Sequence, residues 1–247
     1  MDRKAFFDAA RKTVFGGSIT PEQLLHSEAL LEAIEQSKWP LAWAAYGLAT
    51  AFWETDRFTS LIERGGDAYF KRMYDPYGER PKLARSMGNV NAGDGARYRG
   101  RGYVHLTWLI NYAKASRMLG IDLVSNPELA RRPDIAASVM FTGMRDGWFT
   151  GKGLGDYLKA RQKPDYLNAR RIINGMDKAG TIAGIARNFE AALVASGYGA
   201  QKPATPVKPV TTPTPAPTPV HPQPASPVAP MGFWSRFRAA LQKRLSA

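Results

Sequence analysis

The sequence predicts a mainly α-helical domain, followed by a linker and a short amphipathic helix. Apolar residues recur at helical spacing along most of the chain, and the alternation typical of strands is scarce. After Gly199 the composition changes, because residues 203–230 contain 11 of the chain's 18 prolines and cannot form a packed core. We therefore expect a folded domain over residues 1–201, a flexible Pro/Thr/Ala-rich linker over 202–230 and a cationic amphipathic helix over 231–247.

The first helices are marked by their ends. Residues 2–15 form an apolar helical face that Gly16-Gly17 terminates. Thr20 predicts the cap of a second helix, with Pro21 at its first position and Gln23 able to close a capping box. We expect helices over residues 2–15, from 21 to about 37, and from Pro40 to Glu54.

The later part of the chain alternates turns with helices. Residues 65–95 are rich in glycine, proline, asparagine and aspartate, which predicts an irregular segment. Irregular segments of this length inside a domain are usually functional. We expect further helices over residues 108–119, stopped by Gly120, and over 133–144, 165–173 and 181–195.

Charge and cysteine content restrict the partners and the compartment. The 34 basic residues outnumber the 21 acidic ones, giving a net charge of +13 that suits a polyanion such as nucleic acid, an anionic membrane or a bacterial wall. Cysteine is absent, which suits a reducing cytoplasm and excludes disulfides and thiolate metal sites. The N-terminus lacks the apolar core of a secretory signal, and no apolar run reaches the length of a membrane span.

Glu54 is the first candidate for chemistry. It follows Phe52 and Trp53 at the end of an apolar helical stripe, and burial disfavours the charged form of a carboxyl group, so Glu54 could act as a general acid. A second acidic residue, Glu63, follows nine positions later. In an unbroken helix it would face away from Glu54, so a shared cleft requires a bend at Thr59-Ser60 or at the glycines that follow Arg64.

A longer pattern extends this hypothesis. Trp53-Glu54-Thr55, the run RYRGRGYVHLTWLINY over residues 97–112, and Ile172-Ile173-Asn174-Gly175 occur in this order. Together they resemble glycoside hydrolase family 19, which contains plant-type chitinases and many phage and bacterial endolysins. The resemblance covers about residues 1–198 and implies a lysozyme-like, two-lobed helical domain with a substrate cleft.

The resemblance also implies an inverting glycosidase with two carboxyl groups. In such enzymes one carboxylic acid protonates the leaving oxygen while a carboxylate about 6.5 to 9.5 Å away activates water. Glu54 matches the family's acid, and Glu63 is our prediction for the base. Asp56 and Asp94 are the rivals for the base.

The remaining site predictions follow from the family pattern. Thr107 resembles the residue that helps to hold the attacking water. Arg101, His105, Asn111 and Asn174 match substrate-binding positions, and Arg101 could also pair with the catalytic carboxylates. Structural explanations remain open, since His105 could be a packing residue and Asn174 a turn residue.

Two departures from the family favour its endolysin branch over chitin hydrolysis. Trp53 replaces a histidine found in many relatives, and Thr55-Asp56-Arg57 stands where plant enzymes carry glycines. We therefore expect an endolysin, of the lysozyme or muramidase type, that hydrolyses β-1,4 bonds between the amino sugars of bacterial peptidoglycan. A chitinase is the runner-up.

The tail adds an expectation of its own and a further alternative. Residues 231–247 carry four basic residues and no acidic one beside aromatic residues, so we expect contact with an anionic membrane or lipopolysaccharide. The alternatives are a tail that docks on the domain and a membrane-active antimicrobial protein that acts mainly through it. We expect a monomer without cofactor, metal or nucleic acid, made in the host cytoplasm and acting in the periplasm and cell wall.

Overall fold

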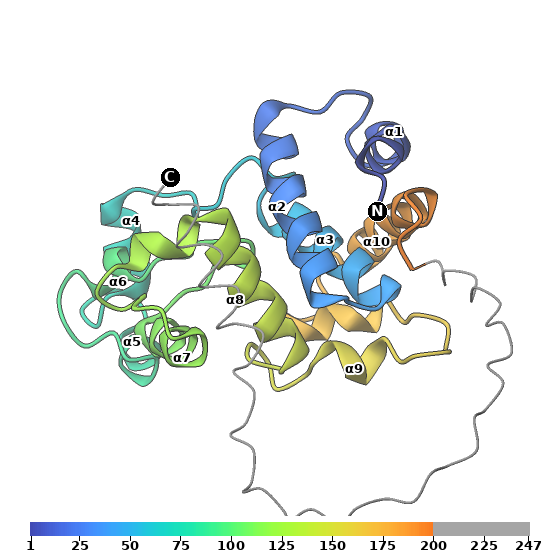
Figure 1. The fold of residues 1–247 in the computed structure, drawn as a ribbon. Helices are drawn as coiled ribbons and strands as arrows, with labels where there is room; N and C mark the ends of the chain where they lie inside the picture. The colour runs from blue at the N-terminus through green and yellow to red at the C-terminus, as the bar shows by residue number, and fades with distance from the viewer. Residues whose placement is uncertain (200–247) are drawn as a thin grey trace, which may run out of the picture. The chain divides into compact units, whose positions relative to one another are not determined.

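The fold is described by a computed structural model for residues 1–199, and this part of the chain is mainly helical, as predicted (Figure 1). It contains isolated β-bridges but no strands. Within the same residues, no helix has both the length and the apolar character that crossing a membrane requires. The predicted linker at 202–230 and the predicted helix at 231–247 lie outside the described residues.

The helices are joined by connections of different lengths, and the longer ones include residues 55–66 and 98–108. In the first part of the domain the helices are α1 (Arg3–Thr13), α2 (Pro21–Ser37), α3 (Leu41–Glu54), α4 (Asp67–Tyr74), α5 (Pro81–Ser86) and α6 (Asp94–Arg97). In the second part they are α7 (Leu109–Leu119), η1 (Pro127–Arg131), α8 (Pro133–Arg145), α9 (Leu154–Tyr157), η2 (Asn168–Ile172) and α10 (Ala179–Ala195), where η denotes a 3₁₀ helix.

Local sequence signals account for several of these boundaries. The capping box predicted at the start of α2 is confirmed: the Thr20 hydroxyl accepts from the Gln23 amide at 3.2 Å, and the Gln23 side chain accepts from the Thr20 amide at 3.0 Å. Both bonds satisfy amide donors that a helix start leaves unpaired. Gly120 ends α7 with a φ of 64°, the left-handed conformation that favours glycine.

Helix α3 is the centre of the domain. It is apolar on almost every side and packs against α2, α8 and α10. Figure 1 shows α4 to α7 as one group of helices and α1, α2, α3 and α10 as another, with α8 between them. One hydrophobic core includes residues from both groups, such as Phe52 and Phe189 from one and Tyr98 and Tyr112 from the other.

The segment predicted to be irregular contains three short helices, α4, α5 and α6. They are too short to produce a clear hydrophobic period, and contacts distant in sequence hold them. The buried Asp75 carboxylate accepts from the amides of Gly93 and Gly95 at 2.8 and 2.5 Å, tying the end of α4 to the start of α6. The helix predicted over 165–173 is the shorter 3₁₀ helix η2, and α9 was not predicted.

Candidate active site

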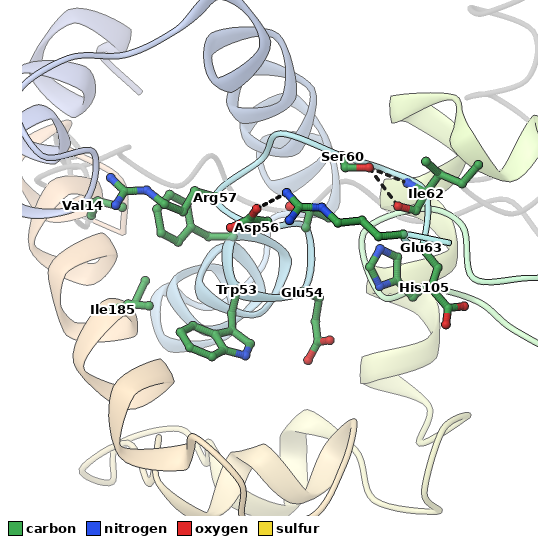
Figure 2. A pocket seen from close by; sticks show the side chains of 13 residues that line it. Val14, Trp53, Glu54, Asp56, Arg57, Ser60, Ile62, Glu63, His105 and Ile185 are labelled. Carbon is green, nitrogen blue, oxygen red and sulfur yellow. Dashed lines mark hydrogen bonds and ion pairs between the residues drawn. The ribbon is translucent and has the colours of Figure 1, made fainter. Parts of the chain in front are cut away.

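A cavity of about 700 Å³ lies at the C-terminal end of α3. Its lining includes both acidic residues singled out in the sequence, Glu54 and Glu63, together with His105 and Trp53 (Figure 2). In Figure 2 the His105 ring lies between the two carboxyl groups. The cavity therefore combines residues from the end of α3, the following loop and the segment after α6.

Glu54 is the last residue of α3 and has a charged partner. Its Oε1 accepts a hydrogen bond of 2.5 Å from Nη1 of Arg170, and the two side chains are 20% and 4% exposed. The Arg170 side chain also donates to the carbonyl of Asp177 at 3.1 Å, which fixes the guanidinium group. The apolar neighbours predicted for Glu54 are therefore only part of its surroundings, because η2 brings a buried cation to the end of α3.

The chain reverses immediately after Glu54. Asp56, Arg57 and Phe58 have φ values of 50°, 64° and 64°, a left-handed turn that is unusual for residues with side chains. The surroundings hold it in place, because Phe58 is fully buried in the core and the buried Gln23 side chain donates to the Arg57 carbonyl at 3.1 Å. The bend therefore lies at residues 56–58, earlier in the chain than either predicted place, Thr59-Ser60 or the glycines that follow Arg64, and it returns the chain towards Glu63.

Backbone hydrogen bonds join the residues around Glu63 to the segment that contains Gly100 and Gly102. The Glu63 amide donates to the Gly100 carbonyl at 2.9 Å, and the Gly102 amide donates to the Leu61 carbonyl at 2.8 Å. Both carboxylate oxygens of Glu63 are also held: the Tyr74 hydroxyl donates to Oε1 at 2.7 Å and the Gly100 amide donates to Oε2 at 3.0 Å. Glu63 is therefore fixed by two donors on different segments.

Gly100 is required where it stands. A β-carbon at this position would lie 2.9 Å from Oε2 of Glu63 and 2.9 Å from the β-carbon of His105. Only glycine leaves room for the two side chains to approach the backbone this closely. Gly100 therefore allows Glu63 and His105 to lie against the backbone of the segment over residues 97–112.

His105 lies in the turn of a tight hairpin. Backbone hydrogen bonds of 3.2 and 2.8 Å join Arg101 and Leu106, and His105 itself has a φ of 47°. Its buried Nε2 has no hydrogen-bond partner among the described residues. Burial lowers the pKa of His105, although the nearby carboxylates of Glu54 and Glu63 oppose the shift. The ring is therefore a neutral group in the cavity at neutral pH.

Three other residues were predicted from the family pattern: Thr107 and Asn111 lie next to this hairpin, and Asn174 lies in a turn after η2. Thr107 donates to the His105 carbonyl at 2.7 Å, and Asn111 donates to the Thr107 carbonyl at 2.8 Å. Asn174 is exposed, and its side chain accepts from the Gly175 amide at 2.8 Å, as a turn residue does. None of these three side chains lines the 700 Å³ cavity, so their predicted contacts with water or sugar stay predictions.

The expected pairing of Arg101 with the catalytic carboxylates is wrong. Its side chain is 2% exposed and donates from Nη2 to Glu128 at 2.6 Å, and from Nη1 to the Tyr112 hydroxyl at 3.0 Å. The bonds of Nη1 to the carbonyls of Arg97 and Arg99 complete its environment. Arg101 therefore stabilises the backbone of residues 97–101 from within the core, and the cation that pairs with Glu54 is Arg170.

Asp56 and Asp94, the two rivals for the base, both bind other groups of the chain through their carboxylates. Asp56 lines the cavity but forms an ion pair with Arg64. Asp94 is buried away from the cavity, where its carboxylate accepts from the amides of Val90 and Asn91 at 2.9 and 2.8 Å. Glu63 remains the carboxylate that shares the cavity with Glu54 and, within residues 1–199, has no cationic partner within hydrogen-bond distance.

Two residues of the site, Arg170 and Tyr74, were missed in the sequence. Arg170 and Arg171 form a basic pair just before the Ile172 to Gly175 motif, which was a signal for a cation close to it, but the sequence does not tell which of the two is buried. Tyr74 had no such signal, because α4 is short and its contact with Glu63 spans an irregular connection.

Comparisons with known proteins find likeness in structure but not in sequence. No family model and no curated protein matches the chain. Chitinase C from Streptomyces griseus HUT6037 has 18% identity and a TM-score of 0.48, covering 79% of this chain and 76% of that one. A mutant chitinase C gives 19% identity and a TM-score of 0.47, covering 80% and 92%. A bacterial family 19 chitinase gives 22% and 0.43, covering 79% and 94%. At these values the likeness does not extend to an activity.

Proposed function

We propose that this protein hydrolyses the glycan backbone of bacterial peptidoglycan with inversion at the anomeric carbon. The observation that supports this proposal is the shared cavity, into which Glu54 and Glu63 project from either side of His105 (Figure 2). Inverting hydrolysis needs two separated carboxyl groups with space between them for a sugar and a water molecule. A cavity of about 700 Å³ has room for both.

Glu54 is the proposed general acid. A general acid must carry a proton when the sugar is bound and must reach the glycosidic oxygen from the cavity, which Glu54 lines at the end of α3. The proton of Glu54 then passes to the glycosidic oxygen as the bond between that oxygen and the anomeric carbon breaks. The carboxylate left behind is stabilised by Arg170, whose guanidinium already lies 2.5 Å away.

Glu63 is the proposed general base. Its carboxylate accepts a proton from a water molecule, whose oxygen forms the new bond to the anomeric carbon from the opposite face of the sugar. The donors Tyr74 and Gly100 fix both oxygens of Glu63 and leave further lone pairs for the water. In this proposal the neutral His105 bonds the sugar between the two carboxyl groups through Nε2, which has no hydrogen-bond partner within residues 1–199.

Charge favours peptidoglycan over chitin, which is the runner-up substrate. The cavity lining carries the exposed Arg57 and Arg64 beside Glu54, Asp56 and Glu63, and Arg64 pairs with Asp56, so the positive charge that favours an anionic substrate is that of the whole chain, +13. Peptidoglycan carries carboxylates on the peptides of its sugars, whereas chitin is an uncharged polymer. Opposite charge on the substrate raises the rate of encounter and is screened by salt.

The test is hydrolysis of purified peptidoglycan and of colloidal chitin, followed by the appearance of new reducing ends. Glu54→Gln and Glu63→Gln should each lower kcat by at least a hundredfold, since general acid and base catalysis contribute about 10² to 10⁴ each. Glu22→Gln, on the exposed start of α2, is the matched control and should retain full activity. New reducing ends from chitin but not from peptidoglycan would overturn this proposal and support a chitinase activity instead.

The proposal includes a place of action and a role for residues 231–247. We place the protein in the periplasm and wall, with the four basic residues of the tail aiding contact with an anionic membrane. Changing Arg236, Arg238, Lys243 and Arg244 to glutamine in the full chain should abolish binding to anionic vesicles while leaving hydrolysis of purified peptidoglycan unchanged. Full bacterial killing by Glu54→Gln would instead favour a membrane-active protein that acts mainly through its tail.

A further inference from the structure

A second groove, of about 550 Å³, adjoins the cavity that contains Glu54 and Glu63. The two share Ser60 and Ile62 in their linings, so the loop from residue 60 to 62 separates them as a common wall. The Ser60 side chain bonds both to the carbonyl and to the amide of Ile62, at 2.9 and 3.3 Å, which makes this wall a rigid turn. A ligand that fills the cavity could therefore extend a branch into the groove.

Positive charge exceeds negative charge at the groove. Glu128 is the carboxylate on its rim, and three guanidinium groups surround it: those of Arg101, Arg131 and Arg99 at 2.6, 3.0 and 3.7 Å. Burial opposes the ionisation of Glu128, but its bonds with Arg101 and Arg131 outweigh this effect and lower its pKa. Arg101 pairs with Oε1 of Glu128 and Arg131 with Oε2, so Arg131 shares one carboxylate with two other guanidinium groups and, at 51% exposure, can be reached by another anion.

Arg132 adds a second accessible cation beside an apolar floor. Its side chain is 37% exposed and lies 2.9 Å from Asp134, while that of Arg131 is 51% exposed. Leu25 and Leu61 line the groove with Ile62, so apolar surface lies next to the two guanidinium groups. This combination suits a short chain that carries carboxylates together with small apolar side chains.

We propose that this groove binds the acidic peptide attached to the sugar that occupies the cavity. The proposal rests on the proposed function and names the feature of peptidoglycan that the protein recognises. The sugar lies between Glu54 and Glu63, its peptide passes the Ser60 to Ile62 wall, and carboxylates of the peptide pair with Arg131 and Arg132. Chitin has no peptide and leaves the groove empty.

The experiment compares two glycans that differ only in the peptide. One is intact peptidoglycan, and the other is the same glycan after an amidase has removed its peptides. The double variant Arg131→Gln/Arg132→Gln should lose about tenfold in kcat/KM on the intact glycan, because two partly exposed charge pairs together contribute on the order of that factor. On the peptide-free glycan its kcat/KM should equal that of the wild type.

A matched control removes two cations elsewhere. Lys4 and Arg145 are also exposed and paired with neighbouring carboxylates, Asp8 and Asp146, so Lys4→Gln/Arg145→Gln changes the net charge equally. It should keep wild-type activity on both glycans. Equal losses for the two double variants, or equal losses on the two glycans, would overturn the proposal.

The wild type provides a second measurement if the double variant does not fold. It should cleave the intact glycan faster than the peptide-free one, and this preference should shrink as salt screens the charges. Equal rates on the two glycans would refute peptide binding in the groove and would leave the proposed hydrolysis of the glycan unaffected. Cleavage of neither glycan would refute the proposed function and the groove with it.

Discussion

Gly100→Ala tests whether the positions of Glu63 and His105 matter, because it changes neither of them chemically. The new methyl group would lie 2.9 Å from Oε2 of Glu63 and 2.9 Å from the β-carbon of His105. Carbon atoms in contact prefer about 3.5 to 4.0 Å, so the neighbours must move by roughly half an ångström. Overpacking of this kind costs about 1 to 3 kcal/mol of unfolding free energy.

The expected effect on catalysis follows from that displacement. A misplacement of about 1 Å costs on the order of a hundredfold in rate, so half of it should lower kcat about tenfold. The assay is the release of reducing ends from peptidoglycan, with urea unfolding as the stability measurement. Gly184→Ala in α10 is the control, since none of the neighbouring atoms in the described part of the chain lies within 4 Å of its added methyl group. A Gly100→Ala protein with wild-type kcat and stability would refute this account of the site.

Three further predictions concern other parts of the domain. Arg170→Met should lower the unfolding free energy by about 2 kcal/mol and should also reduce kcat. The loss of stability is smaller than for a fully buried pair because Glu54 is 20% exposed. Urea unfolding measures the first effect and the peptidoglycan assay the second. His105→Gln should flatten the pH dependence of stability. In the wild type the lowered pKa of His105 means that the unfolded state binds more protons, so this residue's contribution to stability is present above pH 6.5 and is lost as pH falls below it. Thermal melting of both proteins from pH 7 to 5 checks this, and an equal fall in Tm for the wild type and the variant would contradict it. Lys38→Gly should raise the unfolding free energy by about 1 kcal/mol, because Lys38 ends α2 with a φ of 50°, whereas Lys38→Ala should not.

The helices with strong local signals were predictable from the sequence. The capping box of Thr20 and Gln23, the proline starts of α2 and α8 and the stop at Gly120 depend on neighbouring residues, and each lies where it was predicted. The short helices between residues 65 and 97 depend on distant contacts such as those of Asp75. A period of apolar residues cannot reveal them, because each is too short to show one.

The candidate site was predictable in its carboxyl groups but not in their partners. Glu54 was selected for its apolar neighbours and its match to the family's acid, Glu63 was selected as the base from the family resemblance, and both line one cavity. The ion pair of Arg170 with Glu54 joins residues 116 positions apart, and nothing local in the sequence specifies such a pairing. Arg101 was misassigned for the same reason, because a buried arginine has no preference for one carboxylate until the fold brings Glu128 beside it.

The anomeric configuration of the first product tests most directly whether Glu54 and Glu63 act as an acid and base pair. Proton NMR during the first minutes of peptidoglycan cleavage would resolve the new reducing end before it equilibrates between its anomers. Attack by water on the face opposite the leaving group predicts the α-anomer from a β-1,4 bond, and Glu63→Gln should suppress its appearance. An initial β-anomer, or an undiminished α-anomer signal in Glu63→Gln, would contradict the account.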